Sequence, residues 1–245
     1  MTKIVHPYAH RLGIIRDWKS RWFAGEPKKY REFLRVDAAI RALIAKRLKG
    51  SHVSHIEIER SQKALRVAIH TARPGMVIGR SGESATKLKK DMVQMLKSMG
   101  LSSVPSLSLD IMEIRTPESN AAVVAAMVIE GLEKRMPFRR VLKQTIDKVM
   151  ANREVQGVRI QVSGMLGAGS MSRTENLKKG RIPLQTFRAD IDYAHDEANL
   201  PLGKIGIKVW IYRGDIFADR KNATEPRGAM NDSRPRAPRM QNSSN

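Results

Sequence analysis

Two glycines that bracket a basic and a small residue, Gly79-Arg80-Ser81-Gly82, separate a stretch of alternating apolar side chains from a stretch with helical spacing. Because glycine lacks a Cβ atom, the backbone N–H groups of such a loop can approach a phosphate closely. A helix that begins near Glu83 would direct the positive end of its dipole to the same point. The segment therefore predicts an anion-binding turn. The G-x-x-G pattern alone is common, however, so its flanking segments must show whether it is an ordinary turn or a binding loop.

The residues before the loop predict a helix followed by a β-hairpin. Residues 55–60 and 64–70 both alternate apolar and polar side chains, and Ser61-Gln62-Lys63 between them favours a turn. Upstream, apolar residues recur at helical spacing over residues 33–48 and stop before Gly50, which indicates an amphipathic helix.

A second helix and a third strand are expected after the loop. Apolar side chains recur at helical spacing over residues 85–96, before Gly100, and residues 107–111 alternate with period two. The resulting order of helix, two strands, short helix, GXXG loop, helix and strand is similar to the type II KH topology. In KH domains the GXXG loop clamps the nucleic-acid backbone, so we expect residues 79–82 to contact RNA.

The chain of 245 residues is strongly basic, with 45 lysines and arginines against 24 acidic residues and a formal net charge of +21. Such an excess favours a polyanionic partner, since each cation that meets a phosphate releases condensed counterions. An anionic membrane is the rival partner, but no apolar run approaches the roughly 18 residues of a transmembrane helix. The N-terminus lacks a signal-peptide core, so we expect a cytoplasmic protein with no membrane partner. The absence of cysteine excludes disulfides, thiol catalysis and cysteine-ligated zinc.

Four segments are expected along the chain. Residues 1–32 form a basic and aromatic arm, which either lies on RNA or packs onto the following domain. Residues 33–115 form a type II KH domain with helices on a three-stranded sheet. Residues 116–216 form a second domain, and residues 217–245, rich in Pro, Arg, Asn and Ser, form a basic tail that we expect to be disordered.

The second domain begins at Thr116 and Pro117, which favour a helix start through an N-cap and a proline in the first turn. Apolar spacing predicts one helix that ends before Pro137 and another that begins at Phe138. Three strands with alternating side chains follow, over residues 158–162, 187–193 and 205–211. Helices followed by strands predict an α+β domain whose helices pack on a mainly antiparallel sheet.

A series of short segments, in order along the chain, carries a likeness to a known family. These segments are Val5-His6-Pro7, Arg11-Leu12-Gly13-Ile14, His70-Thr71-Ala72-Arg73-Pro74-Gly75, Val77-Ile78-Gly79, Phe138-Arg139-Arg140, Arg173-Thr174-Glu175, Gly180-Arg181, Pro183-Leu184, Arg188-Ala189-Asp190-Ile191-Asp192-Tyr193 and Gly206-Ile207-Lys208-Val209-Trp210-Ile211. Through them the chain resembles the bacterial type of the small-subunit ribosomal protein S-three family, over nearly its whole length except the tail.

This resemblance implies a structural rRNA-binding protein in the head of the small ribosomal subunit, near proteins S-ten and S-fourteen. It also implies a place at the mRNA entrance channel with proteins S-four and S-five, where a basic helix face assists the unwinding of mRNA. The matching residues are Arg139, Arg140 and Lys143, whose spacing puts them on one broad helix face opposite Leu142 and Ile146. Clustered cations can hold single strands without reading sequence; without the family, a merely solvated basic face would be the simpler interpretation. The further arginines that we expect to contact rRNA are Arg11, Arg73, Arg173 and Arg181.

Two positions depart from the family pattern. Met165 stands where an arginine is usual and cannot make an arginine–phosphate contact. Gln185 stands where a histidine is usual and can still form hydrogen bonds.

Other binding chemistry finds little support in the sequence. Residues 75–81 lack the spacing and the lysine of a P-loop, and residues 164–169 suit a flexible loop better than a dinucleotide fingerprint. His52, His55 and His70 come near one another in the predicted hairpin, but the sequence does not identify the further ligands that a metal site needs. We therefore expect no metal, no cofactor and no catalytic residue.

The densest acidic group is Asp190, Asp192, Asp196 and Glu197. The two aspartates share a strand face with Arg188, which suggests salt bridges rather than paired catalytic carboxylates. A magnesium-dependent nuclease would need such carboxylates to converge on a metal. The alternative to a ribosomal protein is therefore a free KH-type RNA-binding regulator or a nucleic-acid-processing factor.

Overall fold

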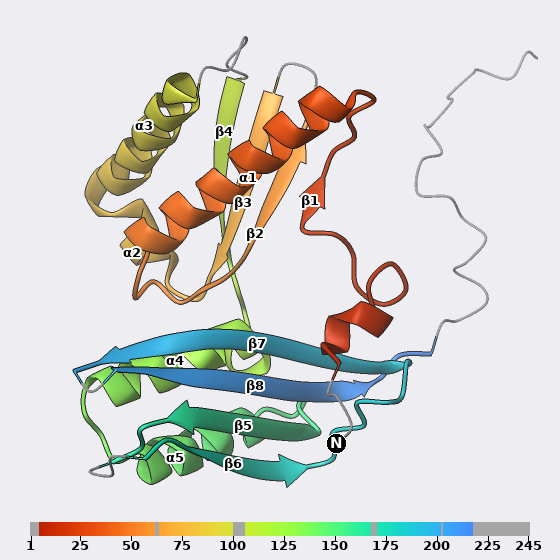
Figure 1. Cartoon of the computed structure of the whole chain (residues 1–245), viewed down its shortest axis with the longest axis vertical. Coiled ribbons are helices and arrows are strands. Elements are labelled where there is room, and N and C mark those ends of the chain that lie inside the picture. The colour runs from red at the N-terminus through yellow and green to blue at the C-terminus, as the bar shows by residue number, and fades with distance from the viewer. Residues whose placement is uncertain (1–4, 62–63, 100–105, 168–170, 202, 218–245) are drawn as a thin grey trace, which may run out of the picture.

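The computed structural model describes residues 5–61, 64–99, 106–167, 171–201 and 203–217, which form two units stacked along the long axis of the molecule (Figure 1). The first unit and its arm contain η1 (Pro7–His10), β1 (Ser20–Arg21), α1 (Pro27–Arg47), β2 (Val53–Arg60), β3 (Ala64–Thr71), α2 (Pro74–Ile78), η2 (Arg80–Gly82), α3 (Glu83–Ser98) and β4 (Ser106–Glu113). The second unit contains η3 (Pro117–Ser119), α4 (Ala121–Glu133), α5 (Phe138–Met150), β5 (Gly157–Gly164), β6 (Arg173–Gly180), β7 (Ala189–Leu200) and β8 (Gly203–Asp215). Within these described residues, no helix has both the length and the apolar character needed to cross a membrane.

The first unit is built on a sheet with the strand order β1-β2-β3-β4. Strands β2 and β3 form the predicted antiparallel hairpin, and β4 lies parallel to β3. The order of elements and these pairings confirm the type II KH topology expected from the sequence. The additional strand β1 comes from the arm and lies parallel to β2. The sequence does not predict it, because two residues are too short to show a period.

Helices α1 and α3 pack against one face of this sheet and enclose the first core. The buried side chains of this core are Val36, Ile40, Ile44, Ile56, Ile58, Leu65, Val67, Ile69, Leu88, Met92, Leu96 and Leu107. Helix α1 begins at Pro27, earlier than the predicted residue 33, because a proline in the first turn presets the helical φ. The first helix therefore starts inside the segment that the sequence assigns to the arm.

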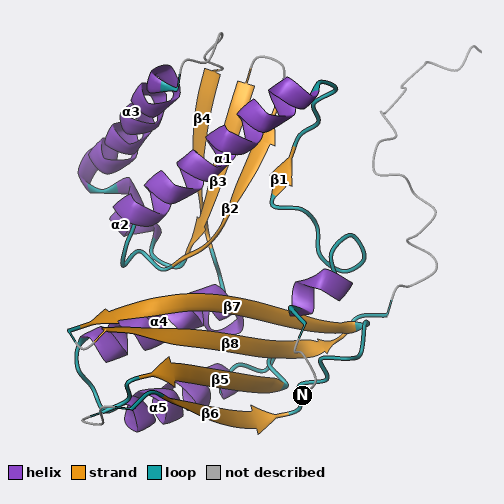
Figure 2. Cartoon of the chain, viewed as in Figure 1, coloured by secondary structure: helices purple, strands orange, loops and turns teal. Residues whose placement is uncertain are grey.

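The second unit is a four-stranded antiparallel sheet in the order β6-β5-β8-β7. Helices α4 and α5 lie along one face of it (Figure 2). Their buried residues pack on alternate side chains of the two central strands, among them Ile160 and Val162 of β5 and Ile207 and Val209 of β8. The prediction of an α+β domain with helices on a mainly antiparallel sheet is confirmed.

The first helix of the second unit starts later than the sequence indicates. Residues Pro117–Ser119 form only a 3-10 turn, and the α-helix begins at Ala121. Its N-cap is Asn120 rather than Thr116: the Asn120 side chain accepts hydrogen bonds from the amides of Ala122 and Val123, at 3.1 and 3.3 Å.

One strand of this sheet is absent from the sequence prediction, and another begins at a different residue. Strand β6 carries a single large apolar side chain, Leu177, so its alternation is invisible in the sequence. Strand β7 begins at Ala189. Phe187, expected in that strand, lies before it and is 61% exposed.

The arm contacts both units. The Trp22 indole donates a hydrogen bond to Asp37 of α1 at 2.7 Å, and the Tyr8 hydroxyl donates to the Asp192 carboxylate on β7. Packing of the arm onto the domains is therefore confirmed for these two rings. Trp18 and Phe23 remain 55% and 90% exposed, so the same arm also offers rings to a partner.

A hydrogen bond and an ion pair join the first unit directly to α4. The imidazole of His52 lies 3.1 Å from Glu130, and Lys49 lies 3.4 Å from Glu133. These contacts, together with those of the arm, hold the two units against each other.

Candidate nucleic-acid interface

Residues 79–82 form a turn that requires glycine at its first position. Gly79 has φ +73° and ψ −175°, a conformation that is essentially confined to glycine. A Cβ atom here would lie 2.3 Å from Ser84 Oγ and 2.8 Å from Ser84 Cβ. Gly82 has φ +78°, with open space where its Cβ would lie. The first glycine is therefore required by conformation and by close approach, whereas the second is only favoured, by its left-handed conformation.

The turn presents Arg80 and Ser81 to solvent at the N-terminus of α3. This helix spans 16 residues, and its N-cap, Gly82, has no side chain that could accept hydrogen bonds from the first helical amides. Those amides and the positive end of the helix dipole suit an anion. The structure thus gathers the predicted loop residues into a geometry that fits a phosphate.

A basic face of α3 continues from the loop. A groove of about 430 Å³ on this helix is lined by Thr86, Lys89, Lys90, Val93, Gln94 and Lys97. Sequence reasoning missed these lysines as functional candidates. The run Lys87-Leu88-Lys89-Lys90 carries the signal, because only Leu88 in it is buried.

Helix α5 turns a second basic face to solvent. Leu142 and Ile146 are buried in the second core, while Arg139, Arg140 and Lys143 are exposed on the other side of the helix. The spacing of the sequence predicts this division, since residues three and four apart share a face. We call these three residues the α5 basic face.

Neighbouring residues hold one member of the α5 basic face in place. Arg139 lies 3.3 Å from Glu175 Oε1, and Arg173 lies 3.6 Å from the same oxygen. Both guanidinium groups also lie 5.6 Å from the centre of the Phe138 ring. Arg140 and Lys143 form no ion pair with any residue that the structure describes. The fold therefore brings Arg139 and Arg173 together and leaves the other two cations unneutralised.

The expectation that Arg11 contacts rRNA is wrong for this chain. The Arg11 side chain is fully buried and donates hydrogen bonds only to backbone carbonyl groups. Their residues and distances are Ala189 at 2.7 Å, Pro7 at 2.8 Å, Thr186 at 2.8 Å and Leu184 at 3.0 Å. Arg11 thus fastens the arm to the second unit.

The remaining expected arginines are accessible. Arg73 and Arg181 are both exposed, and Arg73 also lies 3.5 Å from Glu130. They remain candidates for phosphate contacts.

The aspartates of β7 form salt bridges, but not with Arg188. Asp192 is buried and lies 3.2 Å from Arg16 and 3.0 Å from Arg213, while Arg188 pairs with Asp215 at 2.9 Å. Burial alone would raise the pKa of Asp192, yet the two arginines and the hydrogen bonds from Tyr8 and Ala121 outweigh it and hold that pKa below its ordinary value. This carboxylate is therefore ionised and serves to attach the arm.

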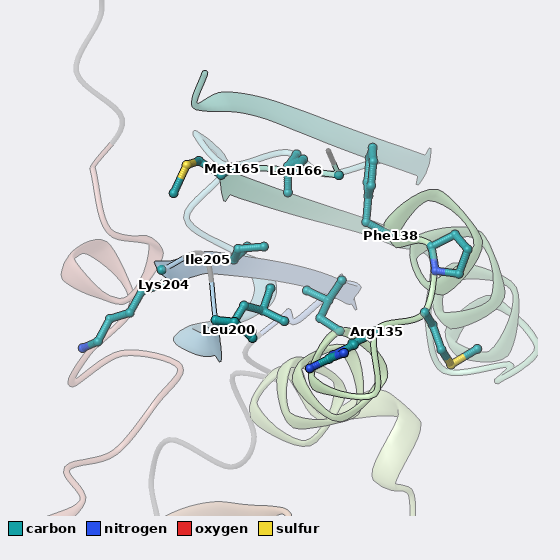
Figure 3. A pocket seen from close by; sticks show the side chains of 13 residues that line it. Arg135, Phe138, Met165, Leu166, Leu200, Lys204 and Ile205 are labelled. Atoms are coloured by element: carbon teal, nitrogen blue, oxygen red, sulfur yellow. The ribbon is translucent and has the colours of Figure 1, made fainter. Parts of the chain in front are cut away.

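An apolar pocket of about 460 Å³ lies beside the start of α5, between the α4–α5 connection and the turn that joins β7 to β8 (Figure 3). Phe138, Leu166 and Ile205 are among the side chains that line it. Met165 also lines the pocket and lies beside Gly203. A thioether suits this apolar wall, which gives Met165 a packing role.

Comparison with known proteins gives matches over most of the chain. The family model for the C-terminal domain of ribosomal protein S3 matches residues 128–211, and the model for the KH domain matches residues 39–119.

Curated relatives named small ribosomal subunit protein uS3 align with most of the chain. The relative from Caldicellulosiruptor bescii is 45% identical over 228 residues, which are 93% of this chain and 99% of the relative. The relative from Endomicrobium trichonymphae is 46% identical over 90% of this chain and 90% of its own length. The relative from Listeria monocytogenes is 42% identical over 92% of this chain and 99% of its own length.

Proposed function

This chain belongs to the uS3 family of small ribosomal subunit proteins, and we propose that it binds rRNA in the head of that subunit and lines the mRNA entrance channel. As a member of this family it is a non-enzymatic component of the ribosome, with rRNA and other ribosomal proteins as partners. We propose that it acts in the cytoplasm.

The exposure of the α5 basic face is the single observation that best supports a role in binding mRNA. Its three cations are exposed on a helix whose other side is fixed in the core. Arg140 and Lys143 have no acidic partner in the part of the chain that the structure describes, so their charge is available to phosphates. Such a cluster binds single strands without sequence preference, which an mRNA channel requires.

The turn at residues 79–82 supports the rRNA role. It offers Arg80, Ser81 and the first amides of α3 to one anion, and the α3 lysines lie along the same helix. We propose that a backbone phosphate of rRNA lies at this turn, with further contacts from Arg73, Arg173 and Arg181.

For protein neighbours we propose S-ten and S-fourteen in the head, and S-four and S-five at the mRNA entrance. Large apolar side chains on the arm and near β7 are available to such contacts: Ile14 is 80% exposed, Phe23 is 90% exposed and Phe187 is 61% exposed. Single exposed apolar side chains are normal on a protein surface, so the family resemblance supports this proposal and these side chains only permit it.

Crosslinking on intact particles tests these assignments. A photo-crosslinking residue replaces Lys143 on α5 in one variant and Lys46 on α1 in a control, since both lysines are exposed and helical. We expect both variants to co-sediment stoichiometrically with the small subunit, and only the Lys143 variant to crosslink to mRNA. A chain that fails to co-sediment would favour the free KH-type regulator instead. Equal mRNA crosslinking from both positions would contradict the channel assignment.

A further inference from the structure

Three side chains with metal-binding atoms meet on the first sheet, on the face opposite α1 and α3. His55 and Glu57 lie two residues apart on β2, so both point to the same face of the sheet. His70 lies directly opposite His55 on β3. Because Ile56 and Ile58 of β2 point into the core, the backbone itself brings these three side chains together on the other face.

The three side chains lie close together but form no short hydrogen bonds with one another. The two imidazole rings stack, with 4.1 Å between their centres. The Nε2 atoms of His55 and His70 lie 3.5 and 3.8 Å from the two carboxylate oxygens of Glu57. Both separations exceed that of a normal hydrogen bond. The buried Nε2 of His70 has no hydrogen-bond partner among the described residues, which is a costly state for a polar atom.

Two imidazoles and one carboxylate are an established set of zinc ligands, and such three-ligand sites keep a fourth position for water. One ligand atom from each of the three side chains lies within 4.8 Å of the other two. His52, which the sequence groups with His55 and His70, instead contacts Glu130 at 3.1 Å. Glu57 is therefore the ligand that the sequence could not identify.

The surroundings of His55 suit a metal ligand. The Ser54 hydroxyl lies 3.0 Å from His55 Nδ1, and a hydrogen bond donated from Nδ1 would orient the ring and leave Nε2 for a metal.

Two of the three side chains also border a cavity, which His70 does not line. A cavity of about 530 Å³ between the arm and the two units has His55 and Glu57 in its lining, and therefore offers a path for an ion and room for a bound water. Lys19 and Asp192 line the same cavity. With Arg16, Arg21 and Arg213, which also line the cavity, the cation of Lys19 opposes a bound metal, while the carboxylates of Asp17 and Asp192 favour it.

In place of the sequence-based expectation of no metal, we propose that His55, Glu57 and His70 bind a divalent transition-metal ion of the zinc type, with water in the fourth position. Metal–ligand bonds of about 2.0–2.2 Å require the three ligand atoms to close on a common centre. The two stacked imidazoles would have to rotate away from their parallel arrangement to reach this centre. The metal would satisfy the unpaired His70 nitrogen and fasten β2 to β3 beside the arm.

Metal titration of the full chain tests the proposal. The purified protein is stripped with a chelator, and Zn²⁺ binding is then measured by calorimetry, with Co²⁺ as a spectroscopic probe. We expect one site, with the visible absorption of four-coordinate Co²⁺. The variant His70→Gln should weaken Zn²⁺ binding by at least about 100-fold, because loss of even an outer-shell partner costs roughly 10–100-fold. The control His195→Gln removes an exposed histidine on β7 and should leave binding unchanged.

Three further results test the proposed metal site. The isosteric variant Glu57→Gln should also lose the Co²⁺ absorption, and it keeps the assay informative if His70→Gln does not fold. In the unaltered chain, bound Co²⁺ should shift the ring NMR signals of His55 and His70 more than those of the other histidines. No binding by the unaltered chain, or unchanged binding by folded His70→Gln or Glu57→Gln, would overturn the proposal.

Discussion

Arg139 and Glu175 form an ion pair 3.3 Å long that joins α5 to β6 at the edge of the second unit. Arg173 approaches the same carboxylate at 3.6 Å, so one acidic group balances two arginines. The carboxylate therefore fixes the direction of Arg139 and lowers the positive potential of the α5 basic face.

Replacing Glu175 by Gln should strengthen RNA binding with little effect on stability. Loss of the carboxylate leaves both arginines unbalanced, and we expect the Kd for single-stranded RNA to fall about two- to five-fold, equivalent to roughly 0.4–1 kcal/mol for an exposed pair. The unfolding free energy should change by less than about 1 kcal/mol. The control Glu197→Gln breaks the exposed pair with Lys204, 2.9 Å long, away from this face. If both variants bound RNA equally well, Glu175 would have no special influence on the α5 basic face.

Replacing Asp192 by Asn should destabilise the chain strongly. Its carboxylate is buried between Arg16 and Arg213, and removal of one partner from a buried ion pair costs about 3–5 kcal/mol. The control Asp17→Asn breaks the exposed pair with Arg21 and should cost about 0–1 kcal/mol. Chemical denaturation of the three proteins measures both effects; equal losses would remove the distinction between the buried and the exposed pair.

The contribution of Asp192 should also depend on pH in a defined direction. Its pKa is lowered in the folded chain, so the stabilisation is fully present above the unfolded pKa of about 3.9 and is lost as pH falls through the lower folded value. The difference in unfolding free energy between the unaltered chain and Asp192→Asn should therefore stay constant above about pH 5 and shrink at lower pH. A difference that grew on acidification would have the wrong sign.

The two glycines of the turn should differ in their tolerance of a side chain. Gly79→Ala places a Cβ against Ser84 in a conformation essentially confined to glycine, and we expect a loss of about 2–3 kcal/mol or more. Gly82→Ala meets open space and should lose only roughly 1–2 kcal/mol, from its left-handed φ. Denaturation midpoints at constant m-value give the comparison. A larger loss for Gly82→Ala would contradict the geometry of the turn.

Acidic residues in the turn should weaken RNA binding without unfolding the chain. In the variant Arg80→Asp/Ser81→Asp, two exposed carboxylates replace a cation and a hydroxyl at the start of α3. We expect the Kd for rRNA fragments to rise about 10- to 100-fold, since a charge-assisted hydrogen bond is worth roughly 1.5–3 kcal/mol. The control Arg35→Asp/Ala38→Asp makes the same change of charge at exposed positions of α1. Binding that weakened equally in both would reflect net charge alone, and the turn would have no local role.

Sequence patterns predict the first unit well because its information is local. Ile56 and Ile58 alternate with polar residues, and Leu65 and Val67 do the same on the paired strand, so both the hairpin and its buried face follow from one period. Alternation of side chains does not predict strand β6, because its pairing with β5 makes it a strand. Leu177 pairs with Ile160 of β5, and the residues next to Leu177 in the sequence are polar.

The candidate sites divide in the same way. The exposure of Arg139, Arg140 and Lys143 follows from helical spacing around Leu142. The burial of Arg11 does not, because its carbonyl partners at Leu184, Thr186 and Ala189 are distant in sequence and converge only in the folded chain. The tertiary fold thus decides which cations remain available to RNA.

The central claim is that the α5 basic face acts on mRNA, and translation through a stable hairpin tests it most directly. Small subunits containing Arg139→Ala/Arg140→Ala/Lys143→Ala are compared with subunits containing Lys28→Ala/Arg35→Ala/Lys46→Ala, which removes three exposed charges from α1. Alanine favours helix, so both variants should fold and assemble. We predict that only the α5 variant slows elongation through a downstream hairpin, while unstructured messages are translated at the normal rate. Equal slowing on both kinds of message, or failure of the α5 variant to assemble, would show that this face is ordinary rRNA-binding surface.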